Sequence, residues 1–192
     1  MPIDVHDMGL DFASCSAHKI YGPKGIGAAF IKSDAYGIPP ITALMHGGEQ
    51  ENGFRAGTLA VHNIVGFGKA AEIALRDLDE NEKRILRYDK MLVEGLMEID
   101  GISLTNQSDK RLPGIISIIV DKNDFNNERF IKHISDRLAL STGSACSAGE
   151  PSYVITALGL EDKVSKVLRL SLNKHTTEEE INQLIMILRE EL

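Results

Sequence analysis

The stretch that decides the fold is Ser16-Ala17-His18-Lys19-Ile20-Tyr21-Gly22-Pro23-Lys24-Gly25. A short strand ending in small polar residues precedes it, and residues 26–32 alternate as a returning strand does. The glycines and the proline between these segments are typical of a turn. We therefore expect Lys19 to lie between two strands.

Lys19 has two interpretations at this stage. A lysine in such a connection can form a Schiff base with a carbonyl cofactor, because partial burial and nearby positive charge make its amine more reactive. The plainer alternative is a lysine at a strand end with its ammonium group in water. The spacing by itself favours the plainer alternative.

The segments after this turn predict a loop and then a long helical region. Residues 38–57 are too rich in glycine for a regular element and form a candidate binding loop. A helical period then runs from Ala70 to Ile99, as one long helix or as two with a kink. Charge density rises near residue 77, where we place the domain division.

The second half of the chain predicts an α/β domain. β-Branched and apolar runs predict strands over residues 115–120 and 167–172, and residues 127–138 predict a helix between them. Thr177-Glu178-Glu179-Glu180 is a capping box that opens a last helix. The expected buried stripe of that last helix consists of Ile181, Leu184, Ile185 and Leu188.

The composition narrows the class of protein. The 192 residues are 43% hydrophobic, which suits a buried core, and carry a net charge of -7, which argues against direct binding of nucleic acid. No apolar run reaches the roughly 20 residues of a membrane helix, and the first residues lack the pattern of a secretory signal. We expect a cytoplasmic protein with reduced thiols, without membrane contact, and we identify no metal site.

The two cysteines have different surroundings. Cys146 lies in residues 141–151, a run of small side chains whose opening costs little free energy, so its thiol can act as an exposed nucleophile. A free cysteine that is merely tolerated in a loop is an equal alternative. Cys15 lies beside Phe12 and Ala13 in a predicted strand, where we expect a small buried hydrophobic side chain.

Arg169 and Thr58 are further candidates for binding. Arg169 is flanked by leucines on a predicted strand, and its guanidinium would suit a substrate carboxylate; an arginine on the wet face of the strand is the alternative. Thr58 lies where a loop enters a helix, a place that can bind phosphate, although an ordinary N-cap is at least as good an interpretation.

Together the motifs are more specific than any one alone. They follow one another along nearly the whole chain as Ser16-Ala17-His18-Lys19 with its glycine turn, His46-Gly47-Gly48, Arg55-Ala56-Gly57-Thr58, Ser144-Ala145-Cys146, Glu150-Pro151-Ser152-Tyr153 and Arg169-Leu170-Ser171. In this order they closely resemble the cysteine desulfurases of the NifS and IscS type. The resemblance implies an α/β fold, the C-terminal part of a fold-type I pyridoxal-phosphate (PLP) transferase. Residues 1–76 would end the large domain, and residues 77–192 would form the small C-terminal domain.

The resemblance also implies a role for each site residue. Lys19 matches the lysine that binds the cofactor, and Ser16 and His18 match residues that hold its phosphate. Thr58 matches a threonine that reaches the phosphate in the neighbouring subunit, which implies a homodimer. Cys146 matches the catalytic cysteine, and Arg169 matches the arginine that binds the carboxylate of L-cysteine.

The implied reaction converts L-cysteine to L-alanine and leaves a persulfide on Cys146 for a sulfur acceptor or scaffold protein. Family members carry a preceding half with further cofactor contacts, so we expect this chain alone to bind PLP weakly and to have little activity. The loop after Cys146 is two residues shorter than in housekeeping members. The acceptor therefore stays open between iron-sulfur cluster assembly, tRNA thiolation and DNA phosphorothioation.

Three other readings compete with a desulfurase. Another class V PLP aminotransferase or lyase would keep Lys19 but have no use for Cys146. A non-catalytic remnant would bind a partner without needing Lys19. A rhodanese-like sulfur carrier would leave Lys19 and its flanks unexplained.

Overall fold

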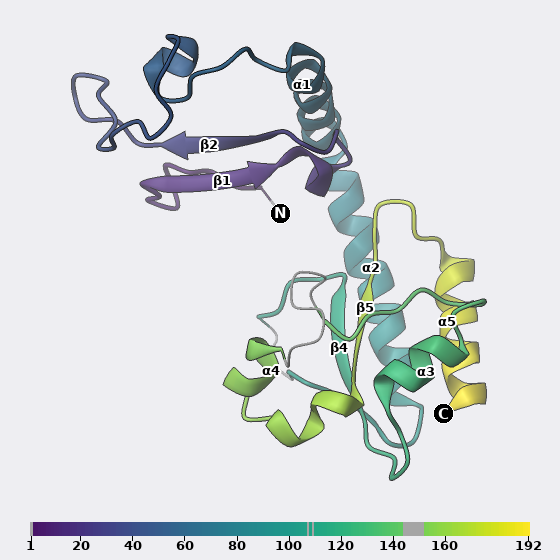
Figure 1. Ribbon diagram of the computed structural model, residues 1–192. Helices are drawn as coiled ribbons and strands as arrows, with labels where there is room; N and C mark the ends of the chain where they lie inside the picture. Colours follow the sequence, from purple (N-terminus) through teal and green to yellow (C-terminus); the bar gives the residue numbers. More distant parts are fainter. Residues whose placement is uncertain (1, 107, 109, 144–151) are drawn as a thin grey trace. The chain divides into compact units, whose positions relative to one another are not determined.

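The computed structural model describes residues 2–106, 108, 110–143 and 152–192 (Figure 1). The chain divides into two compact units, Met1–Glu80 and Asn81–Leu192, which we call unit 1 and unit 2. This division lies four residues after the predicted one. The assignment of unit 1 to the end of a large domain, and of unit 2 to a small domain, remains a prediction.

Unit 1 contains the predicted pair of strands around Lys19. Strand β1 (Phe12–Ser16) pairs antiparallel with β2 (Gly27–Ile31), and the short 3-10 helix η1 (Ala17–Ile20) follows β1 directly. A second short 3-10 helix, η2 (Gln50–Gly53), lies in the glycine-rich segment before helix α1 (Val61–Arg76). The expectation that Lys19 lies between two strands is confirmed.

The prediction that Cys15 is buried is wrong. Cys15 lies on β1 opposite Ala28 of β2, and its side chain is exposed. The sheet that the structure describes here has only these two strands, so no described element covers the thiol. A local pattern of apolar neighbours cannot reveal whether a second layer packs on a strand.

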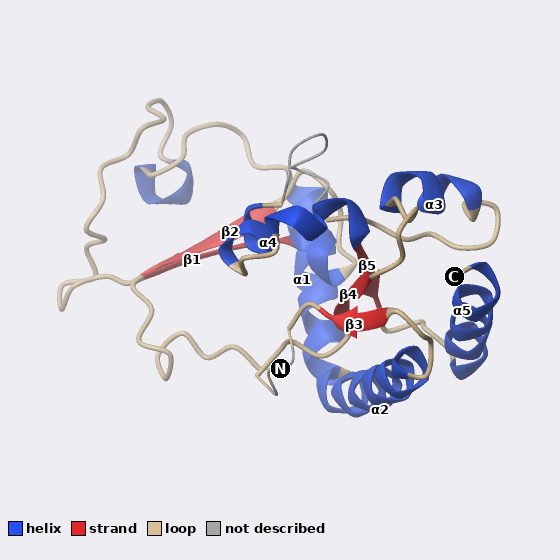
Figure 2. Cartoon of the chain, turned by 90° about the horizontal axis from the view of Figure 1, so that it is seen from below, coloured by secondary structure: helices blue, strands red, loops and turns tan. Residues whose placement is uncertain are grey.

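Unit 2 is a three-stranded antiparallel sheet covered by helices (Figure 2). Its strands β3 (Ile102–Leu104), β4 (Ile115–Val120) and β5 (Val167–Ser171) lie side by side in that order. The other elements are α2 (Leu78–Met97), α3 (Asn127–His133), α4 (Tyr153–Ala157), the 3-10 helix η4 (Glu161–Lys166) and α5 (Glu178–Glu191). Helix α2 follows α1 after Asp77, so of the two alternatives, one long helix or two, the structure has two.

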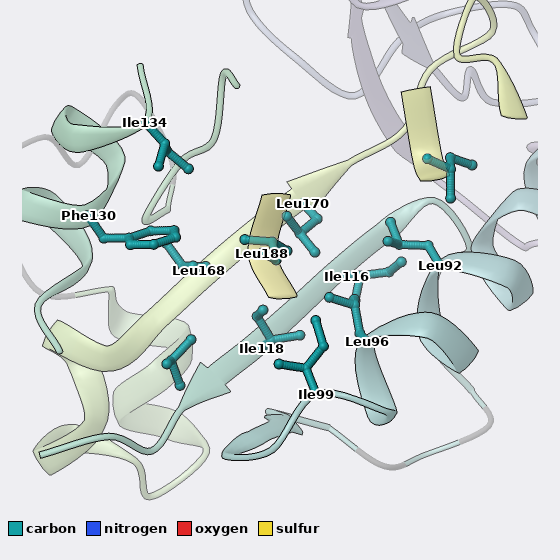
Figure 3. Packing of buried hydrophobic residues seen from close by; sticks show 12 residues of the cluster. Leu92, Leu96, Ile99, Ile116, Ile118, Phe130, Ile134, Leu168, Leu170 and Leu188 are labelled. Atoms are coloured by element: carbon teal, nitrogen blue, oxygen red, sulfur yellow. The ribbon is translucent and has the colours of Figure 1, made fainter. Parts of the chain in front are cut away.

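The main core lies on one face of this sheet (Figure 3). Alternate residues of β4 and β5 point to it, and helices α2, α3 and α5 cover them. Its fully buried side chains include Leu92, Leu96, Ile116, Ile118, Ile134, Leu168, Leu170, Ile181 and Leu188. On the opposite face, Ile119 and Val167 pack against Ile155 of α4 in a smaller cluster. Both faces are therefore partly covered, but only one holds the large apolar core.

The ends of the predicted helices show how local sequence controls them. The capping box of α5 is confirmed, because Thr177 accepts a hydrogen bond from the Glu180 amide at 3.2 Å and Glu180 accepts one from the Thr177 amide at 2.9 Å. Helix α3 ends at His133 and not at residue 138. The Ser135 hydroxyl donates to the Lys132 carbonyl at 2.9 Å, which takes the acceptor that a continuing helix would use.

A buried ion pair fixes β4 on α2. Asp89 of α2 accepts hydrogen bonds from two guanidinium nitrogens of Arg111, one of them at 2.7 Å, and from the Gly114 amide at 2.7 Å. The Asp89 side chain is only 8% exposed and that of Arg111 is 23% exposed. The hydrogen bonds that Arg111 donates to the Asp89 carboxylate raise the pKa of the Arg111 guanidinium. The pair holds the segment that leads into β4.

We expect Asp89→Ala to destabilise unit 2 by about 3 kcal/mol, because Arg111 and the Gly114 amide then lose their acceptor in a largely buried place. The measurement is urea unfolding of the full chain, followed by circular dichroism. Glu94→Ala on the same helix is the control, since Glu94 forms only an exposed pair with Lys90 at 3.8 Å and should cost under about 0.5 kcal/mol. Equal unfolding midpoints for the two variants would contradict the role of the pair.

Candidate functional site

Lys19 is carried by a turn that packs tightly on helix α1. Ala17, at the start of η1, is fully buried, and Ala70 of α1 is 8% exposed. A Cβ atom placed on Gly22 would lie 3.0 Å from the Ala17 side chain and 3.1 Å from that of Ala70, so any side chain here would push this tight junction apart. The small side chains let η1 approach α1 closely and thereby fix the backbone that carries Lys19.

The three predicted cofactor residues of this turn lie within four positions. Ser16 is the N-cap of η1, and its hydroxyl makes no capping hydrogen bond. His18 and Lys19 lie in η1 itself and are both exposed. Tyr21, which ends η1, has a left-handed backbone with φ of 66°, a conformation that turns the chain sharply after Lys19. The structure thus brings Ser16, His18 and Lys19 together on one turn.

Thr58 is not the N-cap of the following helix. Helix α1 begins at Val61, its N-cap is Ala60, and no side chain caps it. Thr58 lies two residues earlier and is exposed. The interpretation of Thr58 as an ordinary N-cap is wrong, because the segment between it and the helix stays non-helical. The expected contact of Thr58 with phosphate does not depend on N-capping and stays a prediction.

Arg169 lies at the centre of β5 and points away from the leucine core. Its neighbours Leu168 and Leu170 are buried in the main core, so its own side chain lies on the opposite face. The Nε atom of Arg169 is buried and has no hydrogen-bond partner among the described residues. A buried guanidinium N–H without an acceptor fits a site for an anion, because leaving such a donor unpaired costs free energy.

The loop that carries Cys146 starts beside Arg169. The amide of Arg169 donates to the Ser141 carbonyl at 2.7 Å, and the amide of Ser141 donates to the Arg169 carbonyl at 3.4 Å. The Ser141 hydroxyl donates to the Gly143 carbonyl at 2.9 Å. Cys146 itself lies outside the described residues. The structure therefore joins Arg169 to the first residues of the cysteine loop.

The site residues are distributed over both units. Ser16, His18, Lys19 and Thr58 belong to unit 1, whereas Arg169 and Ser141 belong to unit 2. Within the described ranges, no three His, Cys, Asp or Glu side chains gather as a metal site would require. The helices of the same ranges include none with the length and apolar character needed to cross a bilayer.

Sequence reasoning missed the residues that surround Arg169. Ser117 lies opposite Arg169 on β4, and Ser141 lies on its other side. The neighbours Thr105 and Ser117 are joined by a backbone hydrogen bond of 3.0 Å. A single hydroxyl residue within an apolar strand was the feature that the sequence offered. Such a residue can be assigned to the site only when the pairing of the strands is known, and the sequence alone does not give that pairing.

Comparison with known proteins places the chain in a family. The model of the class-V aminotransferases matches residues 1–184. Cysteine desulfurase IscS of Shewanella piezotolerans is 43% identical over all of this chain, which covers 47% of that protein. A solved NifS-like protein is 32% identical with a TM-score of 0.83, and the match covers 99% of this chain and 48% of that one. The structure of SspA in complex with cysteine is 36% identical with a TM-score of 0.63, over 91% of this chain and 47% of SspA.

These matches agree with the resemblance of the motifs and define its extent. The chain spans about half the length of the curated relatives that it matches. The family match, in contrast, covers nearly the whole chain and includes both units. The chain belongs to the class-V aminotransferase family.

Proposed function

We propose that this chain provides the cofactor lysine, the sulfur-accepting cysteine and the carboxylate-binding arginine of a cysteine desulfurase. The observation that carries the proposal is the buried Nε of Arg169, which has no hydrogen-bond partner among the described residues. Arg169 pairs with Ser141, where the segment leading to Cys146 begins. A site for a carboxylate next to a reactive thiol is the arrangement that desulfuration of an amino acid requires. The similarity to a desulfurase and to SspA, whose structure contains cysteine, supports the same substrate.

The residues of unit 1 fit pyridoxal phosphate, the cofactor of the family. The Ser16 hydroxyl, which makes no capping hydrogen bond, and the exposed His18 imidazole would hold the phosphate. The amine of Lys19 would hold the aldehyde carbon. The rigid packing of η1 on α1 keeps these groups on one turn. When bound, the cofactor supplies an electron sink for the amino acid carbon next to the carboxylate.

Each residue of the chain then has a separate task. Arg169 binds and orients the carboxylate of L-cysteine. The Lys19 amine, when it is not bonded to the cofactor, would move the proton of the substrate α-carbon. The Cys146 thiolate forms a bond to the substrate sulfur while the carbon-sulfur bond of the substrate breaks. The electron pair stays with carbon, which takes a proton, so alanine leaves and a persulfide stays on Cys146.

The larger assembly belongs to the same proposal. Exposed Thr58 would reach the phosphate in the second subunit of a homodimer, and a sulfur acceptor or scaffold protein would take the persulfide sulfur in the cytoplasm. Iron-sulfur cluster assembly is the acceptor pathway that fits the similarity to IscS. Unit 1 would be the end of the large domain and unit 2 the small domain.

The test uses the assembled holoenzyme, by which we mean this chain together with the rest of the family fold and PLP. We expect L-cysteine to yield alanine and protein-bound sulfur in equal amounts in the first turnover, because one bond cleavage produces both. Amino acid analysis measures alanine, and mass spectrometry measures the persulfide. Transfer of the amino group to a keto acid, without release of sulfur, would instead identify an aminotransferase.

A further inference from the structure

Four polar residues form one row across the sheet of unit 2. Ser117 of β4 lies directly opposite Arg169 of β5, and Thr105 continues the ladder of β3 by donating its amide to the Ser117 carbonyl at 3.0 Å. Ser141 pairs with Arg169 on the far side. Directly opposed residues of antiparallel strands share one face. The side chains of Thr105, Ser117, Arg169 and Ser141 therefore lie on the face away from the main core.

Ser117 is the closest of these neighbours to Arg169. The amide and the carbonyl of Arg169 both bond to Ser141, at 2.7 and 3.4 Å, so neither bonds to Ser117. Ser117 and Arg169 consequently form a non-hydrogen-bonded pair, in which the Cα atoms approach to about 4.5 Å and the side chains are closest. The Ser117 hydroxyl thus stands beside the base of the guanidinium-bearing side chain.

The hydroxyls of the row differ in what they bind. The Thr105 hydroxyl donates to the Ser117 carbonyl at 3.3 Å, and the Ser141 hydroxyl donates to the Gly143 carbonyl at 2.9 Å. Among the described residues, the half-buried Ser117 hydroxyl has no such bond. The buried Nε of Arg169 equally lacks an acceptor there. Two directly opposed residues thus each carry a donor without an acceptor among the described residues, and a carboxylate has two acceptor oxygens to offer them.

We propose that Ser117 is a substrate-binding residue whose hydroxyl donates to the same carboxylate that Arg169 binds. The inference rests on the proposed function and adds to it a residue that selects amino acids over amines. Arg169 supplies charge and a donor at Nε, and Ser117 supplies a second donor from the neighbouring strand. Because both side chains project from paired strands, the backbone ladder fixes the distance between them.

The experiment compares Ser117→Ala with wild type in the assembled holoenzyme, with L-cysteine and cysteamine as substrates. Cysteamine has the same thiol and amine but no carboxylate. We expect kcat/KM for L-cysteine to fall about 10- to 100-fold, as loss of a hydrogen bond to a charged group predicts, while the value for cysteamine stays unchanged. Ser117→Thr keeps the hydroxyl and should restore most of the loss.

The matched control is Ser103→Ala. Ser103 of β3 lies opposite Ile119, on the same face as Ser117 but in the next row, away from Arg169. This variant should leave kcat/KM unchanged for both substrates. The second readout is the dissociation constant of L-alanine, the carboxylate product, which should rise by a similar factor in Ser117→Ala and stay constant in Ser103→Ala.

The outcomes separate this inference from the proposed function. Equal losses for L-cysteine and cysteamine, or unchanged values for both, would overturn the role of Ser117. If the wild type releases no sulfur from L-cysteine, the proposed function fails. The affinity for L-alanine then still decides about Ser117, because a carboxylate site at Arg169 would bind alanine whatever reaction follows, and equal affinities of wild type and Ser117→Ala would overturn it.

Discussion

Replacing Lys19 by alanine is expected to abolish covalent attachment of the cofactor and to lower desulfuration in the assembled holoenzyme by roughly 10⁴-fold, as loss of a covalent catalytic group does. The physical reason is local: the amine at this position is the group that the packed turn of Ala17 and Gly22 presents. Borohydride reduction followed by mass spectrometry of the peptides locates the attachment. Alanine production from L-cysteine measures the activity.

The same turn offers a matched control for this prediction. Lys24 lies five residues after Lys19, is also exposed and carries the same amine. Lys24→Ala should retain both attachment and activity. A cofactor found on Lys24, or attachment that survives Lys19→Ala, would contradict the assignment, and attachment lost equally in both variants would point to a damaged turn. Circular dichroism distinguishes that last case, because both variants should keep the spectrum of the wild type.

Local sequence was sufficient for the elements that carry strong signals of their own. The β-branched run at 115–120 became strand β4 with the predicted bounds, and the capping box at Thr177 starts α5. Both signals act within a few residues: β-branched side chains restrict the backbone, and a cap satisfies free amides of the first helical turn. The family resemblance of the motifs was likewise predictable, and the family match confirms it.

Elements that depend on distant partners were not predictable in the same way. Strand β3 has three residues and exists because Ile102 and Leu104 find partners on β4. Helix α4 is a single short helix held by the contact of Ile155 with Ile119 and Val167. Neither has enough residues for a periodic signal. The strand that carries Cys15 was predicted correctly. The prediction that a second layer covers this strand and buries the thiol was wrong.

The candidate site shows the same limit. The sequence indicated Arg169 as a charged residue among leucines, but two faces of a strand were possible for it. The register of β4 and β5 selects the face and places Ser117 opposite, across 52 positions of sequence. Pairings at such separation follow from the total packing of a sheet and not from any local pattern. The residues that surround a candidate site residue are therefore the part of a site that only the structure reveals.

Cys146→Ser is expected to lower the rate of sulfur transfer by roughly 10⁴-fold while leaving the cofactor attached to Lys19. A serine hydroxyl is hardly ionised at neutral pH and cannot hold a persulfide, so neither alanine nor bound sulfur should form from L-cysteine. The measurements are alanine production, persulfide by mass spectrometry and the absorbance of bound cofactor. Retained absorbance shows that the loss is chemical and not a loss of the binding site.

Cys15→Ser is the matched control for this last variant, because Cys15 is an exposed thiol in the same chain. An exposed thiol can be oxidised or can pick up sulfur by exchange, so accessibility alone does not identify the acceptor. If Cys146 is the acceptor, Cys15→Ser keeps full activity and the persulfide stays on the peptide that contains Cys146. A Cys146→Ser enzyme that still transforms amino acids at an undiminished rate would instead be an aminotransferase or lyase. Its Lys19 would then serve a reaction in which the thiol takes no part.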